Sequence, residues 1–241
     1  MLECACLAHP ETPRMTTDVA SNLVRVQDRI NSACRASSRE PEEVTLIAVS
    51  KRQDLELVKA AIDAGHVDFG ENQVQAMCKR IEDLGRDGIR WHLIGSLQSN
   101  KGKQAIAADW VHGIGSVKAA KAVSKALEKR EDAKLLPILV QVNISNEASK
   151  SGLASEAVEE ALEQCRQLPG LDLRGLMCIP NIDAGRRGFA ALRELRDQLR
   201  LATGLPLPDL SMGMSGDYEE AIAEGATIVR VGRAIFGERS T

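Results

Sequence analysis

Apolar and amphipathic stretches alternate along almost the whole chain. Eight short apolar runs are typical of buried parallel strands; they lie at 44–50, 67–69, 90–95, 110–115, 136–144, 173–179, 207–213 and 226–231. Eight strands that alternate with helices predict a (β/α)8 TIM barrel, with an open doubly wound sheet as the alternative. The sequence lacks the GxGxxG turn that usually marks that alternative.

The segments between the apolar runs have the spacing of helices. Clear apolar stripes are Leu55, Val58 and Ile62; Val158, Leu162 and Cys165; and Phe189, Leu192, Leu195 and Leu199. A further helix is expected at 19–36, before the first strand. The segment 118–131 has lysines at helical spacing and is interpreted as a solvated face. We expect residues 1–15 to be a disordered extension, with Met15 as an alternative start, and 16–241 to form a single domain.

Composition narrows the class of protein. The 241 residues are 44% hydrophobic but only 2% aromatic, so the core must consist of Ala, Val, Leu and Ile. A net charge of −3 argues against nucleic acid as a partner. No apolar stretch is long enough to span a bilayer, and the first residues do not resemble a signal peptide. The six cysteines are scattered without CxxC pairs, which favours a cytoplasmic protein.

The first candidate for chemistry is Lys51, which follows the first apolar run. Residues just past the strands of a barrel face a common mouth, where such folds bind ligands. An amine that loses part of its hydration there becomes a nucleophile toward an aldehyde. A solvated lysine that opens a loop is the ordinary alternative.

The loops after the last two strands have the composition of a phosphate site. Ser215 and Gly216 precede a helix pattern, and Asp217 with Glu220 predicts a capping box. Backbone N–H groups at such a position bind anions, and barrels often hold phosphate after strands seven and eight. Gly232 would allow close approach, and Arg233 would add a charge-assisted hydrogen bond. Glycines that only shape turns are the alternative.

Two polar residues interrupt apolar runs. Arg230 is expected to be buried and therefore to need a partner, with a functional role or an ion pair to Glu71 as the alternatives. His92 is interpreted as a core histidine whose nitrogens are both hydrogen-bonded, and no metal site is predicted. A lysine amine, a phosphate site and an arginine at one cavity suggest pyridoxal 5′-phosphate (PLP) as the ligand. A cofactor-free Schiff-base aldolase stays open.

Eight short motifs occur in order along the chain. They are Ala48-Val-Ser-Lys51, Phe69-Gly-Glu-Asn72, Trp91-His-Leu-Ile-Gly95, Leu97-Gln-Ser-Asn-Lys101, Lys150-Ser-Gly-Leu153, Gly175-Leu-Met177, Ser211-Met-Gly-Met-Ser215 and Val229-Arg-Val-Gly232. Together they closely resemble the pyridoxal phosphate homeostasis protein family, the YggS/PROSC type. The resemblance runs from about residue 19 to residue 237.

The resemblance implies a barrel like the amino-terminal domain of alanine racemase, among the fold-type III PLP-binding proteins. Lys51 matches the Schiff-base lysine of the family. The positions that line the cofactor or its phosphate match Asn72, Met214, Ser215, Arg230 and Gly232. The implied function is to hold and deliver PLP inside the cell without strong catalysis, as a monomer that supplies PLP-dependent apoenzymes.

Two residues depart from the family pattern. Arg233 replaces a common threonine, which puts the phosphate geometry in doubt, and Ser96 replaces a usual proline, which is expected only to loosen a loop. A weak PLP-dependent racemase or lyase is the alternative function. Arginine does not readily give up a proton, so Arg230 leaves the pyridine ring a weak electron sink. Racemisation also needs a second acid or base, and the only tyrosine is Tyr218.

Overall fold

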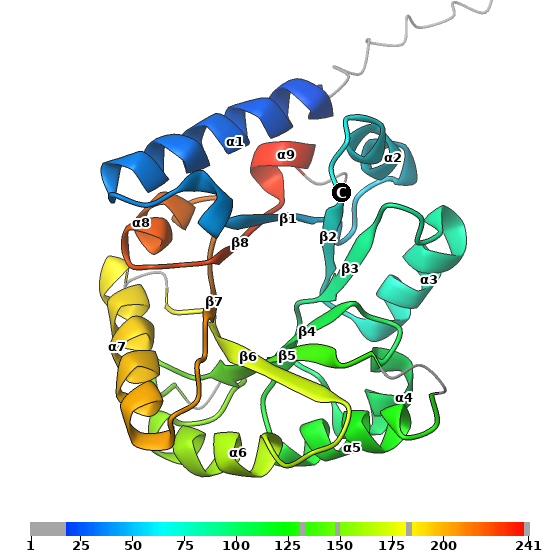
Figure 1. The fold of residues 1–241 in the computed structure, drawn as a ribbon. Helices are drawn as coiled ribbons and strands as arrows, with labels where there is room; N and C mark the ends of the chain where they lie inside the picture. The colour runs from blue at the N-terminus through cyan, green and yellow to red at the C-terminus, as the bar shows by residue number, and fades with distance from the viewer. Residues whose placement is uncertain (1–17, 131–133, 148–149, 182–184, 239–241) are drawn as a thin grey trace, which may run out of the picture.

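Eight parallel strands form a closed barrel in the part of the chain that the structure, a computed structural model, describes: residues 18–130, 134–147, 150–181 and 185–238 (Figure 1). The strands are β1 (Thr45–Val49), β2 (Asp68–Glu71), β3 (Arg90–Leu93), β4 (Trp110–Ile114), β5 (Leu136–Val142), β6 (Leu171–Cys178), β7 (Asp209–Met214) and β8 (Ile228–Val231). Each strand pairs with the next along the chain, and β8 pairs with β1. The predicted barrel is confirmed, and the open sheet is wrong.

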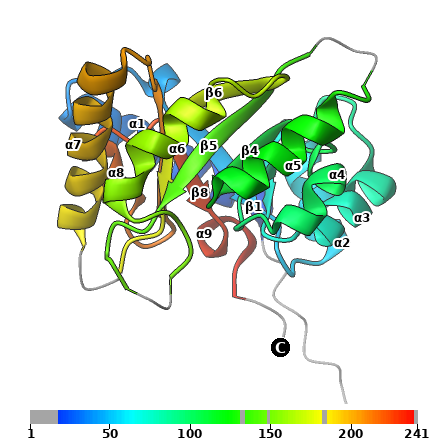
Figure 2. The same cartoon turned by 90° about the horizontal axis from the view of Figure 1, so that it is seen from below.

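Helices surround the barrel (Figure 2). They are α1 (Val19–Ala36), α2 (Leu55–Asp63), α3 (Val74–Leu84), α4 (Gly102–Ala105), α5 (Val117–Leu127), α6 (Val158–Cys165), α7 (Arg186–Thr203), α8 (Tyr218–Ala223) and α9 (Arg233–Phe236), with short 3-10 turns η1 (Pro41–Glu43), η2 (Ser99–Lys101) and η3 (Ser155–Ala157). The predicted solvated face is confirmed on α5. Its exposed lysines are Lys118, Lys121 and Lys125, and Lys129, just beyond the helix, is exposed as well.

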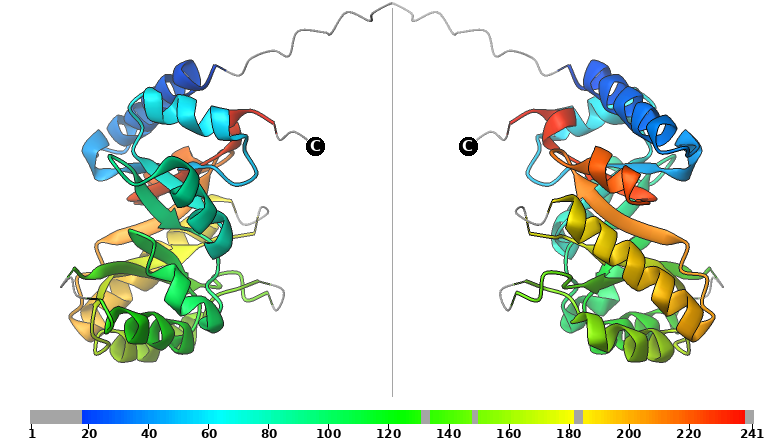
Figure 3. Two further views of the ribbon diagram at one scale, coloured as in Figure 1. Left: turned by 90° about the vertical axis from the view of Figure 1, so that its right-hand side faces the viewer. Right: turned by 90° about the vertical axis from the view of Figure 1, so that its left-hand side faces the viewer.

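The amino-terminal helix α1 packs along the outside of the barrel against α8 and α9 (Figure 3). The carboxylate of Asp18 caps it by accepting the N–H of Ser21 at 3.0 Å. Its buried stripe runs from Val19 to Cys34 with the spacing of one helix face. The predicted helix at 19–36 is therefore confirmed. No helix in the described segments is long and apolar enough to cross a membrane.

The barrel interior contains both apolar and polar side chains. Its apolar part is a cluster of Ile47, Ile94, Leu139, Met177 and Ile228. Buried polar side chains on the same strands or their neighbours are His92, His112, Gln141, Ser211 and Arg230. Side chains alternate across a strand, so the inward position of Ile228 also turns Arg230 inward two residues later. The chain therefore places a charge inside the barrel.

Several predictions about the ends of the chain lie outside the described residues. These are the disordered extension at 1–15 and the alternative start at Met15. Cys165 and Cys178 are buried, with 1% and 0% of their surfaces exposed. Burial raises the pKa of the Cys178 thiol to about 12, so this side chain stays protonated at neutral pH.

Candidate functional site

The strand register brings four predicted site residues to one half of the barrel mouth. Ala48 of β1 lies opposite Phe69 of β2 on one side and Val231 of β8 on the other. Lys51, Asn72 and Gly232 therefore follow three adjacent strands, and Ser215 follows the next strand, β7. Parallel strands end at the same face, so all four residues lie at the carboxyl end of the barrel.

Lys51 lies in a tight turn between β1 and α2. Its side chain is partly buried, and the next residue, Arg52, has a φ of 56°, in the left-handed region that non-glycine residues rarely adopt. From α3, Arg80 donates hydrogen bonds to the backbone carbonyls of Ser50 and Gln53 on either side of Lys51. The turn that presents the lysine is thus held from a neighbouring helix.

A buried carboxylate supports the same turn. Glu71 accepts a hydrogen bond from the Ser50 hydroxyl at 2.8 Å, and its Oε1 lies 3.5 Å from Nε of Arg80. Burial raises the pKa of Glu71, although Ser50, Arg80 and the charge of Lys51 all act against that rise. The ion pair between Glu71 and Arg230 that the sequence offered as an alternative is wrong, because Glu71 is occupied at the turn.

Asn72 is held in place by a close backbone contact. It follows β2, is half-buried, and lies against Gly95, which follows β3. A Cβ built at residue 95 would lie 2.0 Å from the carbonyl oxygen of Asn72, a separation that no packing adjustment of a side chain could relieve. Gly95 therefore lets the ends of β2 and β3 approach each other, and this approach sets the position of Asn72.

The loops after β7 and β8 are tied together by a side chain. The Ser215 hydroxyl oxygen accepts the backbone N–H of Gly232 at 3.1 Å. Gly216 faces open space, because a Cβ built there would meet nothing within 4 Å. Met214 is 39% exposed at the same rim. A hydroxyl, an open loop and the start of α9 therefore lie around one position at the mouth.

The predicted capping box at Asp217 is wrong. Asp217 does stand at the N-cap of α8, but its side chain makes no cap hydrogen bond. Its Oδ1 instead accepts the N–H of Met214 at 2.6 Å, which closes the loop on the side of β7. A short carboxylate can bond backbone on either side of itself, and here the tight turn after β7 takes it.

Arg233 does not point into the group formed by the other predicted site residues. Its side chain is 63% exposed, and its Nη1 lies 3.8 Å from Oε1 of Glu238. An ion pair at that distance on the surface contributes little to stability. In this conformation the guanidinium is turned toward the end of the described chain.

Arg230 is buried inside the barrel, below the rim residues. Its Nη1 donates to the Ser211 hydroxyl at 2.6 Å and its Nη2 donates to the carbonyl of Cys178 at 3.0 Å. Burial lowers the pKa of Arg230, but an arginine remains protonated in proteins. The positive charge is therefore stabilised by neutral oxygen atoms, a partnership that the sequence did not indicate.

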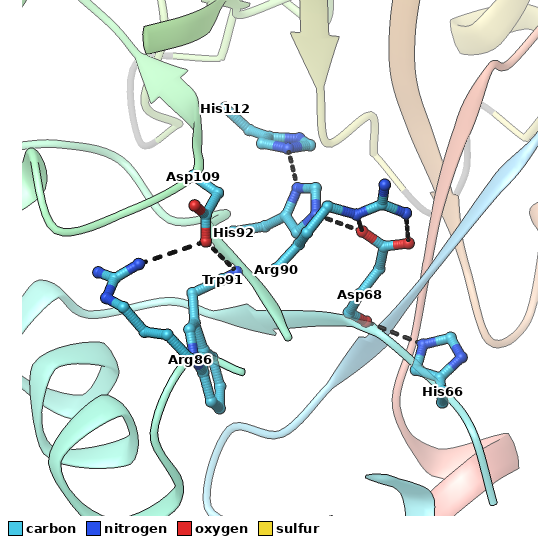
Figure 4. Close-up of polar contacts among 8 residues, drawn as sticks. All are labelled: His66, Asp68, Arg86, Arg90, Trp91, His92, Asp109 and His112. Carbon is cyan, nitrogen blue, oxygen red and sulfur yellow. Dashed lines mark hydrogen bonds and ion pairs between the residues drawn. The ribbon is translucent and has the colours of Figure 1, made fainter. Parts of the chain in front are cut away.

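The interpretation of His92 as a core histidine with both nitrogens bonded is confirmed. Its Nδ1 lies 3.1 Å from Nε2 of His112, and its Nε2 lies 2.9 Å from Oδ1 of Asp68 (Figure 4). Sequence reasoning missed His112, Asp68 and Ser211 as its partners or neighbours. A signal was present, because His112 interrupts the apolar run at 110–115 just as His92 interrupts the run at 90–95.

Ser96 and Tyr218 make contacts that the sequence did not indicate. The Ser96 hydroxyl donates to Oε1 of Gln141 at 2.7 Å, so the replacement of proline ties the loop to β5 rather than loosening it. Tyr218 begins α8 as predicted, but its ring is 1% exposed and lies under Arg29 of α1. Its hydroxyl is buried without a hydrogen-bond partner in the described chain.

The chain is similar to known proteins over almost its whole length. The family described as "Alanine racemase, N-terminal domain" matches residues 22–240. The chain is 43% identical over 231 residues to the pyridoxal phosphate homeostasis protein of Escherichia coli strain K12, which covers 92% of this chain and 97% of that protein. The chain belongs to the pyridoxal phosphate homeostasis protein family. The family resemblance drawn from the eight motifs is thereby confirmed.

Solved structures agree with this family assignment. PipY of Synechococcus elongatus, whose structure was determined with PLP bound, is 32% identical, with a TM-score of 0.76 over 91% of this chain and all of that protein (100%). Alanine racemase of Clostridium difficile 630 is 12% identical, with a TM-score of 0.69 over 93% of this chain and 57% of the racemase. The racemase comparison shows a shared barrel fold, and the family members share that barrel.

Proposed function

We propose that this protein binds PLP through a Schiff base on Lys51 and serves to hold and deliver the cofactor, as a member of the homeostasis family. The observation that carries the proposal is that Lys51 follows β1 at the barrel mouth, while the Ser215–Gly232 contact lies at the end of the adjacent strand β8. An amine and a phosphate-binding loop on one rim match the two ends of PLP. The PLP-bound structure of PipY, a family member, supports the same ligand.

The residues present fit the cofactor. Ser215 accepts the N–H of Gly232, which leaves its own hydroxyl proton free to be donated to a phosphate oxygen. The space beside Gly216 is open, and a group the size of phosphate needs such space. Asn72 and Met214 complete the rim in this proposal. Arg233 would approach the phosphate only after leaving Glu238, so we assign it an auxiliary electrostatic role.

When bound, PLP supplies an aldehyde that condenses reversibly with amines. The task of the surrounding protein is then to present one amine and to limit further chemistry. Arg80 and Glu71 hold the turn on both sides of Lys51. Arg230 cannot readily donate a proton to the pyridine nitrogen, because arginine does not give up its proton, so the ring stays a weak electron sink. This combination favours storage and transfer over strong catalysis.

The alternative function, a weak racemase or lyase, needs a second acid or base at the substrate carbon. Tyr218 does not suit that role, because it is buried between α8 and α1 and burial raises the pKa of its hydroxyl. Incubating the PLP-loaded protein with single amino-acid enantiomers in deuterated water separates the two functions. Exchange of the α-proton at enzyme-like turnover would refute the carrier function.

The experiment for the main proposal is spectroscopic. Freshly purified protein mixed with PLP should develop a visible absorption band, and borohydride should fix the cofactor to the peptide that contains Lys51. Lys51→Ala should lose both signals. Lys118→Ala, which removes an exposed lysine from α5, is the matched control and should keep them. An unchanged band in Lys51→Ala would refute the assignment of this lysine.

Three further parts of the proposal concern the whole protein. Residues 16–241 form one PLP-binding domain, the protein is a cytoplasmic monomer, and PLP-dependent apoenzymes receive the cofactor. The free thiols of Cys34, Cys78, Cys165 and Cys178 suit a reducing compartment. Light scattering after size-exclusion chromatography tests the monomer, and activation of an apoenzyme across a dialysis membrane distinguishes transfer by contact from transfer through solution.

A further inference from the structure

A line of buried polar side chains crosses the barrel interior from Arg230 to Asp68. We call it the interior polar chain; its members, in order, are Arg230, Ser211, His112, His92 and Asp68. Successive contacts are 2.6, 2.9, 3.1 and 2.9 Å long. Each member comes from a different strand, and none has more than 5% of its surface exposed. Figure 4 shows the part from His112 to Asp68.

The direction of every hydrogen bond in the interior polar chain follows from counting protons. Arginine only donates, so the Ser211 oxygen accepts from Arg230; that oxygen has a second lone pair, so the direction of the Ser211–His112 bond depends on where the imidazole protons lie. Burial lowers the pKa of His112 well below its ordinary value, and the neighbouring His92 and Arg230 act in the same direction. His112 is therefore neutral and carries one ring proton, on either Nδ1 or Nε2.

His92 and Asp68 form the last link of the interior polar chain. The carboxylate of Asp68 only accepts, so Nε2 of His92 donates to it; a neutral His92 then has no proton on Nδ1, and this nitrogen accepts from Nε2 of His112. Nδ1 of His112 is then unprotonated and accepts the hydroxyl proton of Ser211. Asp68 is a carboxylate at neutral pH, because its pKa is about 2. Arg90 donates two further hydrogen bonds to the same carboxylate, at 2.6 Å each. All the bonds from Arg230 to Asp68 thus run in one direction.

The opposite direction requires an extra proton. If Nδ1 of His112 donated to Ser211, His92 would have to donate to both His112 and Asp68 and would become a cation. The carboxylate of Asp68, near the amino-terminal end of β2, therefore sets the direction of the Ser211 hydroxyl through the two imidazoles. That hydroxyl is in turn the acceptor that holds Nη1 of Arg230.

We propose that Ser211 and His112 are positioning residues for Arg230, which hold its guanidinium in one orientation toward the PLP site by a hydrogen-bond chain anchored at Asp68. An arginine has five N–H donors, and Ser211 and Cys178 each take one. In this proposal the remaining donors would serve the ring side of the cofactor. Only this last step rests on the proposed function; the orientation of Arg230 is a property of the protein alone.

The first test uses the cofactor-free protein labelled with nitrogen-15. Nitrogen spectra at neutral pH should show both His92 and His112 as neutral rings with the proton on Nε2. The two terminal nitrogens of Arg230 should give separate signals, because a guanidinium bonded at both Nη atoms rotates slowly. In Ser211→Ala these signals should merge and the Nδ1 resonance of His112 should move. Ser211→Thr keeps the hydroxyl and should restore both signatures.

Ser96→Ala is the matched control, because it removes another serine hydroxyl, one that bonds Gln141 instead of His112. It should leave the His112 and Arg230 signals unchanged. Unfolding midpoints of all variants show that each is folded. A proton on Nδ1 of His112, a cationic His92 at neutral pH, or unchanged Arg230 signals in Ser211→Ala would each overturn the proposal.

The second test adds PLP. Ser211→Ala removes a hydrogen bond to a charged group, so PLP affinity should weaken by about tenfold or more. Ser211→Thr keeps the hydroxyl and should restore the affinity. Equal affinity in the wild type and Ser211→Ala would overturn the role toward the cofactor. If the wild type itself failed to take up PLP, the proposed function would fail, and the spectra of the cofactor-free protein would still decide whether the interior polar chain orients Arg230.

Discussion

Asp68→Asn removes the carboxylate at the end of the interior polar chain, and its effect on stability should depend on pH. Burial by itself would raise the pKa of Asp68, but hydrogen bonds from His92 and Arg90 outweigh that effect and lower it from 3.8 to about 2. A lowering of the pKa of this size corresponds to about 2 kcal/mol of folding free energy. The side chain is 7% exposed, so solvent screening is small.

The sign of the pH dependence follows from the lowered pKa. The stabilisation is fully present above about pH 5, where the carboxylate is charged in both the folded and the unfolded chain. It is lost as the pH falls through the unfolded value toward the folded value, and roughly half of it is gone at about pH 3. The asparagine variant has no such titration. The stability difference between the wild type and the variant should therefore shrink by about 1 kcal/mol between about pH 7 and about pH 3.

The assay is guanidinium unfolding of both proteins at the two pH values, read by circular dichroism. Other carboxylates titrate in both proteins, so their contributions cancel in the difference. Asp83→Asn, which removes a surface ion pair with Lys79, is the matched control; its effect should stay within about 1 kcal/mol. A difference between the wild type and Asp68→Asn that is the same at both pH values would refute the electrostatic reasoning.

Three other substitutions test the geometry of the mouth. Gly95→Ala forces a Cβ against the Asn72 carbonyl and should lower stability by about 2 kcal/mol or more in urea unfolding, with weaker uptake of PLP; wild-type stability would contradict the contact. Arg80→Ala removes the bonds to the turn around Lys51 and should speed amide hydrogen exchange in residues 50–53, while exchange in α5 stays the same. Arg233→Thr should change the unfolding free energy by less than about 0.5 kcal/mol, because the arginine is exposed; a larger loss would show a structural role.

Much of the fold could be predicted because local patterns determine it. The apolar runs are long enough to be buried strands. The helical stripes between them indicate that each strand is connected to the next, parallel strand by a helix. The boundaries of α1 match the predicted 19–36 because Asp18 caps one end and the buried stripe has one clear period. The rim residues Lys51, Asn72 and Ser215 could be placed at a common mouth once eight parallel strands were expected.

The partners of the interior residues could not be predicted in the same way. Arg230 is 19 residues from Ser211 and 52 from Cys178, and His112 is 99 residues from Ser211. Glu71 was a reasonable partner for a buried arginine by charge, but the turn at Ser50 and Arg80 occupy it. Asp217 had the spacing of a helix cap, yet it bonds backward to Met214. Arg230 and His112 therefore bond residues on strands that only the closed barrel brings together, while Asp217 bonds the other side of its own turn.

The amino-acid sequence by itself determined the alternation of strands and helices, the barrel class, the family motifs and the lysine at the end of the first strand. Those features depend on side-chain periodicity and on residues close together along the chain. Closure of the barrel decided the rest, because pairing of β8 with β1 brings Gly232 beside Val49, near Lys51. The register between strands determines which polar side chains meet inside the barrel. Arg230 therefore donates to the Ser211 hydroxyl and not to a carboxylate.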